Sequence, residues 1–231
     1  MSKINPFKYY KTSPEIIKLA VMYYIRYPLS LRQVEDILHE RSIDICHETI
    51  RYWWNKFGPL FAKDMKKKKL HSDSNWRWHI DEVFVKINGE THYLWRAVDQ
   101  EGTVLECCVT KRRNKKAALK VLKKLISRHD KPKEIVTDKL PSYKAALRDL
   151  NLSHLQETGR YKNNQAENSH LHFRRRERGM NKFRSMRSLQ KFISIQSIFQ
   201  NHFNHQRHLE TRQNFKHLRQ NSVNLWQKIY A

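Results

Sequence analysis

Acidic residues are scarce in this chain of 231 residues, where 22 Asp and Glu stand against 46 Lys and Arg. The formal net charge at pH 7 is therefore +24. An excess of one sign on this scale opposes the compact state, so it indicates a polyanionic partner. Nucleic acid is the first candidate for that partner, and an anionic membrane surface is the second.

Cysteine and long apolar runs are also scarce. The three cysteines (Cys46, Cys107 and Cys108) form no CxxC pair and predict no disulfide framework, and the adjacent pair is expected to pack in a sheet. No run of about 18 apolar residues occurs, and no signal-peptide pattern opens the chain. We therefore expect a soluble protein of the reducing cytosol.

Aromatic residues, in contrast, are plentiful, with 10 Phe, 10 Tyr and 6 Trp in a chain that is 39% apolar. These side chains are sufficient for a real core. The length allows one large domain or two of ordinary size.

Helix-start signals punctuate the N-terminal part. Thr12-Ser13-Pro14-Glu15 combines a hydroxyl cap with an early Pro, and Ser30-x-x-Gln33 is a capping box. A third helix is expected from about His47 to Phe57, and Gly58-Pro59 is expected to close it.

The second and third of these helices, joined by a short turn, indicate a helix-turn-helix DNA-binding unit over residues 1–63. The side chains expected to face the major groove are Thr49, Arg51, Tyr52 and Asn55. An ordinary three-helix bundle that touches no DNA is the alternative. Residues 64–75 are interpreted as a basic linker.

The stretch from Trp76 to Asp99 predicts two strands. Both faces of the first strand are apolar, which is typical of a central strand covered on both sides. Asn88-Gly89 supplies the positive φ angles of a type I′ turn. Asp81 lies within the first strand, where a carboxylate is costly unless a positive group binds it. An exposed Asp near a strand end is the alternative.

Strand and helix patterns then alternate. After a strand over 103–110 and a helix beginning near Ala117, a short strand over 134–137 is expected to run parallel to the first, because a helix crosses over between them. That strand ends on Asp138, and His154-Leu155 is a candidate for a last edge strand.

Asn163-Asn164 is expected to cap a helix, Gln165 to Arg178, that carries Glu167 in its first turns. A further helix from Leu189 to Phe203 and a basic helical tail over 205–231 follow. The predicted fold class is α/β (α+β), with a mixed five-stranded sheet and flanking helices over residues 76–204.

Asp81, Asp138 and Glu167 are the candidate site. Neighbouring parallel strands would bring the two aspartates together, and a helix packed across the same edge would add the glutamate. Crowded carboxylates require a cation, and oxygen-only ligands favour Mg²⁺ or Mn²⁺, here two ions in a phosphoryl-transfer site. Singly, Asp138 as a helix cap and Glu167 as a first-turn acid have ordinary alternatives.

Basic residues accompany these acids. Arg174 lies two helical turns after Glu167 on the same face, which suits contacts to phosphates near a reacting DNA end. The other expected DNA contacts in this part are Lys139, Arg175 and Arg178. A generic basic surface helix is the alternative.

The histidines indicate no zinc site. His79 shares a strand face with Asp81, and we consider both a role beside the metal site and a core histidine. His202, His205 and His208 recur without cysteine partners and are interpreted as surface or DNA-facing residues.

Four segments carry a resemblance to a known family: Trp78–Glu82, Tyr93–Asp99, Thr137–Tyr143 and Tyr161–Asn168. The chain resembles the bacterial insertion-sequence transposases of the DDE type, in the short single-protein group with an N-terminal helix-turn-helix and a retroviral-integrase-like catalytic domain. The resemblance implies an RNase H-like fold and a metal-binding catalytic triad of Asp81, Asp138 and Glu167. It also places Arg174 at the family's basic position after the Glu.

Two features depart from the family pattern. The segment between Asp138 and Glu167 is shorter than usual, and Ser169 stands where relatives often carry Asp.

The expected function is that of a transposase at the bacterial nucleoid, which nicks the terminal inverted repeats of its element and joins them to target DNA. It would work as a homodimer or larger assembly on paired ends. The alternatives are a non-enzymatic DNA-binding protein or decayed transposase, and a nuclease of the same fold that cleaves without joining.

Overall fold

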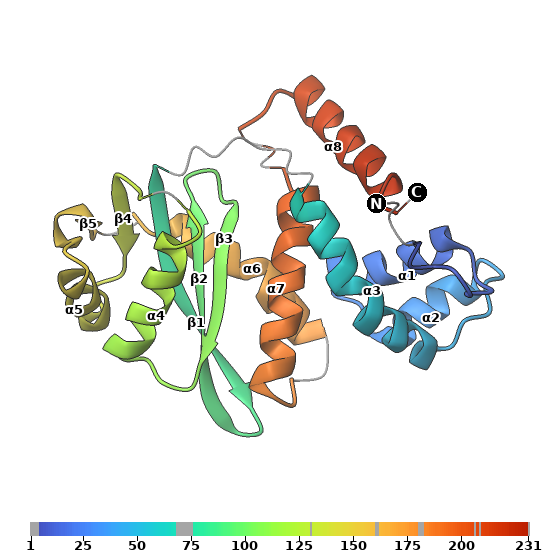
Figure 1. Cartoon of the computed structure of the whole chain (residues 1–231), viewed down its shortest axis with the longest axis horizontal. Coiled ribbons are helices and arrows are strands. Elements are labelled where there is room, and N and C mark those ends of the chain that lie inside the picture. The colour runs from blue at the N-terminus through green and yellow to red at the C-terminus, as the bar shows by residue number, and fades with distance from the viewer. Residues whose placement is uncertain are drawn as a thin grey trace. The chain divides into compact units, whose positions relative to one another are not determined.

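The computed structural model describes residues 5–67, 76–129, 131–159, 162–179, 183–205, 207 and 209–230. The helices in these ranges are α1 (Pro14–Arg26), α2 (Leu31–His39), α3 (His47–Lys67), α4 (Lys115–Ile126), α5 (Pro141–Asp149), α6 (Asn164–Gly179), α7 (Met186–Phe203) and α8 (Arg212–Gln227). The strands are β1 (Arg77–Ile87), β2 (Glu90–Asp99), β3 (Val104–Thr110), β4 (Glu134–Thr137) and β5 (Gln156–Glu157). Figure 1 shows these elements along the chain.

The elements divide into two compact units, each described here by itself. The sheet unit contains all five strands, α4, α5 and most of α6 and α7. The helical unit contains α1, α2, α3, α8 and the C-terminal ends of α6 and α7. The expected boundaries at residues 63, 75 and 204 stay predictions about separable domains, and residues 68–75 of the expected linker lie outside the described ranges.

The strands form one mixed sheet in the order β3-β2-β1-β4-β5. β1 pairs antiparallel with β2 and parallel with β4. Asn88 and Gly89 have φ angles of 51° and 84°, as the predicted type I′ turn requires. The expected mixed five-stranded sheet is confirmed.

The expected edge strand at His154-Leu155 is wrong in position. Residues Ser153–Leu155 form a 3₁₀ turn, and β5 begins one residue later at Gln156. In a 3₁₀ turn, residues three apart share a side. Leu152 and Leu155 therefore both reach the core.

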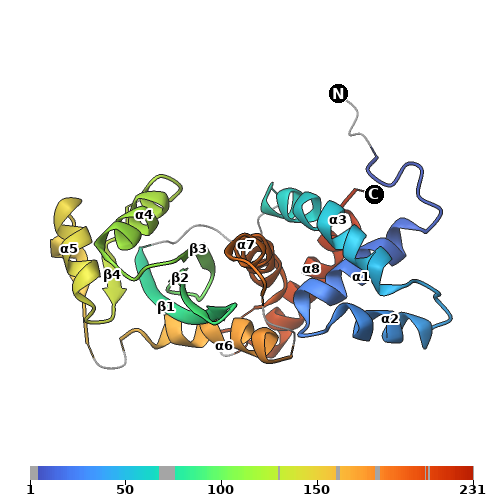
Figure 2. The same ribbon diagram turned by 90° about the horizontal axis from the view of Figure 1, so that it is seen from below.

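Helices cover both faces of the sheet, as Figure 2 shows with α4 and α5 on one side and α6 on the other. One face of β1, with Trp78 and Ile80, packs against α4 and α5. The opposite face, with Val83 and Val85, packs against α6 and α7. The prediction of a central strand buried on both sides is confirmed.

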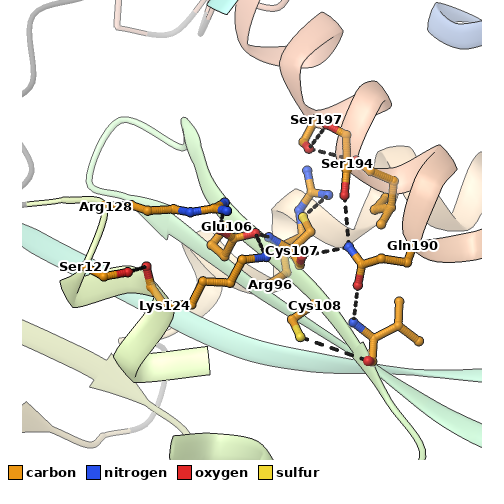
Figure 3. Close-up of polar contacts among 12 residues, drawn as sticks. Arg96, Glu106, Cys107, Cys108, Lys124, Ser127, Arg128, Gln190, Ser194 and Ser197 are labelled. Atoms are coloured by element: carbon orange, nitrogen blue, oxygen red, sulfur yellow. Dashed lines mark hydrogen bonds and ion pairs between the residues drawn. The ribbon is translucent and has the colours of Figure 1, made fainter. Parts of the chain in front are cut away.

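The open edge of the sheet at β3 is bonded to α7. The Gln190 side chain accepts a hydrogen bond from the Val109 N–H at 2.8 Å and donates one to the Cys107 carbonyl at 3.1 Å, as Figure 3 shows. Unpaired edge groups are thereby satisfied within the chain. Cys107 and Cys108 are buried in this strand, as expected.

Polar contacts also join β3 to α4. Glu106, which is buried, accepts from Lys124 at 2.9 Å and from Arg128 at 2.6 Å (Figure 3). The two basic side chains compensate the charge of a carboxylate that would otherwise be costly to bury.

In the helical unit, the predicted caps of the first two helices are present. The Ser13 hydroxyl accepts from the Ile16 N–H, and Ser30 and Gln33 form a reciprocal capping box. Each cap satisfies backbone N–H groups that have no partner within the helix.

The predicted end of the third helix at Gly58-Pro59 is wrong, because α3 continues to Lys67 with Pro59 inside it. Glycine before proline removes the Cβ that would clash in a helical conformation. Phe61 and Met65, which follow the proline, are buried in the core of the unit. Their burial offsets the hydrogen bond that Pro59 cannot donate.

The predicted helical tail is present as α8, which packs closely in the helical unit. Trp226 lies edge-on to Phe61 and to Phe199, with ring centroids 5.3 Å and 5.4 Å away. Lys18 of α1 donates to the carbonyl of Gln227 at 3.1 Å. Across the described ranges, no helix has the length and apolar character needed to cross a bilayer.

Candidate active site

Sheet register sets the positions of Asp81 and Asp138. Ile80 of β1 pairs with Thr137 of β4 in parallel register. The residues that follow them, Asp81 and Asp138, therefore lie at the same level of the sheet. Carboxylate oxygens of Asp81, Glu82 and Asp138 all lie within 4.8 Å of one another. The expectation that the two aspartates meet at this edge therefore agrees with the structure, and the third member of the group is Glu82.

Glu82 is the site residue that the sequence analysis missed. Its carboxylate is fully buried, and its two oxygens accept from Arg113 Nε and from the Tyr143 hydroxyl, the latter at 2.8 Å. Arg113 also donates to Asp138 at 3.2 Å. The only sequence signal was the Asp81-Glu82 pair in a predicted strand, since Arg113 and Tyr143 are distant along the chain.

Asp81 is electrostatically unusual. Burial, together with the neighbouring negative charges of Glu82, Asp138 and Glu167, raises its pKa from 3.8 to about 7. Nδ1 of His170 lies 3.9 Å from the carboxylate. Burial and nearby arginines lower the pKa of that imidazole to about 3, so His170 adds no positive charge. A carboxylate in these surroundings favours a cation.

Glu167 lies in the first turn of α6, where its side chain is exposed. It is near enough to Asp81 to raise the pKa of that carboxyl, but it lies outside the group within 4.8 Å. The structure therefore brings two of the three predicted acids together and places the third beside them.

The start of α6 is tied to β1 and β2. Asn163 donates from its side chain to the carbonyl of Ile80, the residue before Asp81, at 3.0 Å. Arg96, the cross-strand partner of Asp81, is buried and donates to the Ser169 hydroxyl at 3.0 Å. These bonds hold the first turns of α6, which carry Glu167, against the sheet.

Figure 3 shows Arg96 reaching Cys107 as well, with 3.7 Å between Nη1 and Sγ. The Ser169 hydroxyl, which accepts from Arg96, in turn donates to the Ala166 carbonyl of the same helix at 2.6 Å. Ser169, which the sequence left without interpretation, thus joins α6 to the sheet.

The basic residues expected to contact DNA in the sheet unit lie at the surface. Lys139 and Arg175 are exposed, and Arg174 is half-buried. In the helical unit, Arg178 is exposed, whereas its neighbour Arg176 is buried and donates to the carbonyls of Tyr24 and Tyr27.

The residues expected to contact DNA from α3 also lie at the surface. Arg51, Tyr52 and Asn55 are exposed, and Thr49 is half-buried. Tyr52 is bonded to Tyr10 through their hydroxyls at 3.0 Å. Nothing in these contacts tests DNA binding, so all four stay predictions.

The interpretation of the C-terminal histidines as surface or DNA-facing is wrong for His202, whereas His205 is half-buried. His202 is buried with its Nε2 2.9 Å from the Ser222 carbonyl, and His205 lies 2.8 Å from the Ser222 hydroxyl. Both rings satisfy polar groups of α8. His208 lies outside the described residues. His79 is buried, and that burial lowers its pKa.

The donor set at the sheet edge fits a divalent cation. It consists of carboxylate oxygens, which suit Mg²⁺ and Mn²⁺ and not the softer metals. The pKa of Asp81 is raised, and a bound cation would lower it by stabilising the ionised carboxylate.

Comparison with known proteins identifies the family. A family model described as a DDE domain, of the IS240 transposase type, matches residues 75–206. The transposase for the insertion sequence-like element IS431mec of Staphylococcus aureus is 35% identical over 179 residues, which are 75% of this chain and 79% of that one. The transposase for insertion sequence element IS257 in transposon Tn4003, also from Staphylococcus aureus, is 34% identical over the same shares.

The comparison with solved structures also found two integrase catalytic core domains. The catalytic core of BIV integrase is 17% identical, with a TM-score of 0.39 over 54% of this chain and 82% of that one. The HTLV-2 integrase core in complex with magnesium is 15% identical, with a TM-score of 0.40 over 56% and 85%.

The family acts on DNA and depends on divalent metal. Its model covers more than half of this chain, and its curated members align over most of both chains. The chain therefore belongs to the DDE transposases of bacterial insertion sequences and is a polynucleotidyl transferase of DNA transposition.

Proposed function

We propose that this transposase nicks the terminal inverted repeats of its own insertion sequence and joins the freed ends to target DNA, with Asp81, Asp138 and Glu167 as the catalytic triad. The observation that carries the proposal is the parallel register of β1 and β4, which sets Asp81 and Asp138 side by side. Glu167 supplies the third carboxylate from the adjoining turn of α6.

The three carboxylates would hold two Mg²⁺ or Mn²⁺ ions. When bound, such ions would supply the activation of an attacking oxygen and the stabilisation of the leaving oxygen in phosphoryl transfer. The chain would fix the ligands, because the sheet holds Asp81 and Asp138, and the bonds from Asn163 to Ile80 and from Arg96 to Ser169 hold α6.

We expect no covalent protein–DNA intermediate, and the hydroxyl of Tyr143 beside the site is a poor candidate for a nucleophile. Tyr143 is fully buried, and its hydroxyl donates to Glu82. Burial and the charge of Glu82 raise its pKa well above the usual value, so the hydroxyl keeps its proton. In the proposed reaction, water is the nucleophile of the nicking step, and the freed 3′-OH is the nucleophile of the joining step.

DNA recognition is assigned to the positively charged surfaces. The helix-turn-helix of α2 and α3 would bind the inverted repeats through Thr49, Arg51, Tyr52 and Asn55. Lys139, Arg174, Arg175 and Arg178 would contact phosphates near the reacting end. One site serves each end, so we expect a homodimer or larger assembly on paired ends at the nucleoid.

A strand-transfer assay tests the proposal. The purified chain is incubated with an oligonucleotide that carries the element end, a target plasmid and Mg²⁺. We expect nicked and joined products with wild-type protein and none with Asp81→Asn, which should still bind the oligonucleotide in a gel-shift assay.

The other outcomes distinguish the alternatives. Binding without any product from wild-type protein would indicate a decayed transposase or a DNA-binding regulator. Cleavage without joining would indicate a nuclease. Joined products from Asp81→Asn would contradict the proposed triad.

A further inference from the structure

Arg113 joins two of the three clustered carboxylates. It lies in the loop between β3 and α4, and its guanidinium donates to Glu82 and, at 3.2 Å, to Asp138 Oδ2. The guanidinium carbon also lies 5.4 Å from the centroid of the Phe84 ring. Two carboxylates and an aromatic face therefore fix this side chain.

The two carboxylate partners of Arg113 differ in freedom. Glu82 is 0% exposed and is bonded to the buried Tyr143 hydroxyl, so it cannot leave the guanidinium. Asp138 is 36% exposed, and its other oxygen accepts from the Leu140 N–H at 3.0 Å. Arg113 thus has one fixed partner and one partner that faces solvent.

The charges at this edge are unbalanced without a cation. Carboxylate oxygens of Asp81, Glu82 and Asp138 lie within 4.8 Å of one another. Among the described residues, Arg113 is the Lys or Arg that forms an ion pair with members of this group. Its single positive charge lies where the donor set fits a divalent ion.

We propose that Arg113 is a placeholder cation, which neutralises Asp138 in the metal-free protein and releases it when a divalent ion binds. Glu82 and Tyr143 retain the guanidinium throughout, so it stays beside the site after release. This inference rests on the proposed function, because it takes Asp138 to be a metal ligand. Arg113 is a positioning residue and does not contact the reacting phosphate.

Metal affinity is the direct readout of a placeholder. The Kd for Mn²⁺ is measured without DNA, by calorimetry or by the EPR signal of free Mn²⁺. Arg113→Gln removes the competitor, so it should bind Mn²⁺ about tenfold more tightly, the effect that an adjacent opposite charge has on a carboxylate. In metal-free buffer the same variant should unfold at lower temperature, and Mn²⁺ should restore more of its stability than it adds to wild type.

Two further variants separate geometry from net charge. Arg113→Lys keeps the charge, but a single ammonium lacks the guanidinium fork that reaches both acids. It should stay on buried Glu82 and give a Kd that is lower than that of wild type but higher than that of Arg113→Gln. Arg112→Gln removes the same charge from an exposed neighbour and should change the Kd less than about twofold.

An unchanged or weaker Mn²⁺ affinity of Arg113→Gln overturns the placeholder role. An equal tightening in Arg112→Gln overturns it as well, since general charge would then explain the effect. If Arg113→Gln does not fold, Arg113→Lys decides by the same criterion. If wild type binds Mn²⁺ and Asp81→Asn does not, the proposed function stands whatever the Arg113 variants show. If Asp81→Asn binds Mn²⁺ as wild type does, both the proposed function and the placeholder role are contradicted.

Discussion

Two parts of the candidate active site are built differently. Asp81 and Asp138 are set by backbone pairing between β1 and β4, and their carboxylates are already close without an ion. Glu167 is set by a helix, and its exposed side chain lies outside that group. The sheet therefore positions the two aspartates, while the position of Glu167 depends on the side-chain hydrogen bonds that hold α6 to the sheet.

The difference predicts unequal roles in metal binding. Strand register cannot slip without moving a whole buried face, so the two aspartates form a rigid first site. Glu167 on α6 completes the site, and its position depends on the hydrogen bonds of Asn163 and Ser169. Substitutions in the two parts should therefore have different effects on metal binding.

The largest expected effect separates Asp138→Asn from Glu167→Gln. Both should lower strand transfer by about 10³-fold or more, since even one preorganised hydrogen-bond donor is worth 10²–10³. Asp138→Asn should also abolish Mn²⁺ binding, whereas Glu167→Gln should retain one ion in calorimetry. Glu177→Gln on the same helix is the matched control and should match wild type. Loss of all metal by Glu167→Gln would contradict the division into two parts.

A smaller effect is expected from loosening α6 alone. Asn163→Ala removes the bond to the Ile80 carbonyl, so it should reduce strand transfer about 10- to 100-fold, as second-layer changes do at metal sites. The first Mn²⁺ Kd should stay near wild type. The exposed neighbour variant Asn164→Ala should be near wild type in both assays. Equal losses in the two variants would show that Asn163 has no special part in docking the helix.

The smallest effect concerns stability and pH in the rigid part. The folded-state pKa of Asp81 is about 7, against 3.8 in the unfolded chain, so the folded protein holds this proton to higher pH. Asp81 therefore lowers the free energy of unfolding as pH rises from about 4 to about 7, and the full penalty remains above pH 7. In EDTA, the free energy of unfolding of Asp81→Asn relative to that of wild type should therefore rise by on the order of 3 kcal/mol between pH 4.5 and pH 8.

Urea unfolding of both proteins at several pH values checks this. Parallel pH curves for wild type and Asp81→Asn would show that the carboxyl is not perturbed. Saturating Mg²⁺ should stabilise wild type alone, because Asp81→Asn is expected not to bind the ion, and so reduce or reverse the difference.

Local signals explain which features of the fold could be predicted from sequence. Ser13 and Ser30 cap helices through neighbours within three residues, and Asn88-Gly89 dictates its own turn. Asp81 and Asp138 could be brought together because topology rules fix a parallel strand beside β1. Glu167 was predicted from a helix that could pack across the same edge, a packing that no topology rule fixes, and the resemblance to known transposases implied the same residue.

The missed features all depend on distant residues. Helix α3 continues past Pro59 because residues after it are buried by distant parts of the chain, as Phe61 is by Trp226 of α8. The ring of His202 meets Ser222 only through tertiary packing. Glu82 acquires its partners, Arg113 and Tyr143, from 31 and 61 residues away.

The central claim is that acids from two strands and one helix surround the same metal. Fe²⁺ bound in place of Mg²⁺, with ascorbate and peroxide, cuts the backbone next to its ligands, and mass spectrometry locates the cuts. We predict cuts at β1 near Asp81, after β4 near Asp138 and at the start of α6 near Glu167, all suppressed by excess Mg²⁺. Cuts confined to residues 81 and 138, or scattered along the basic surface, would contradict the account.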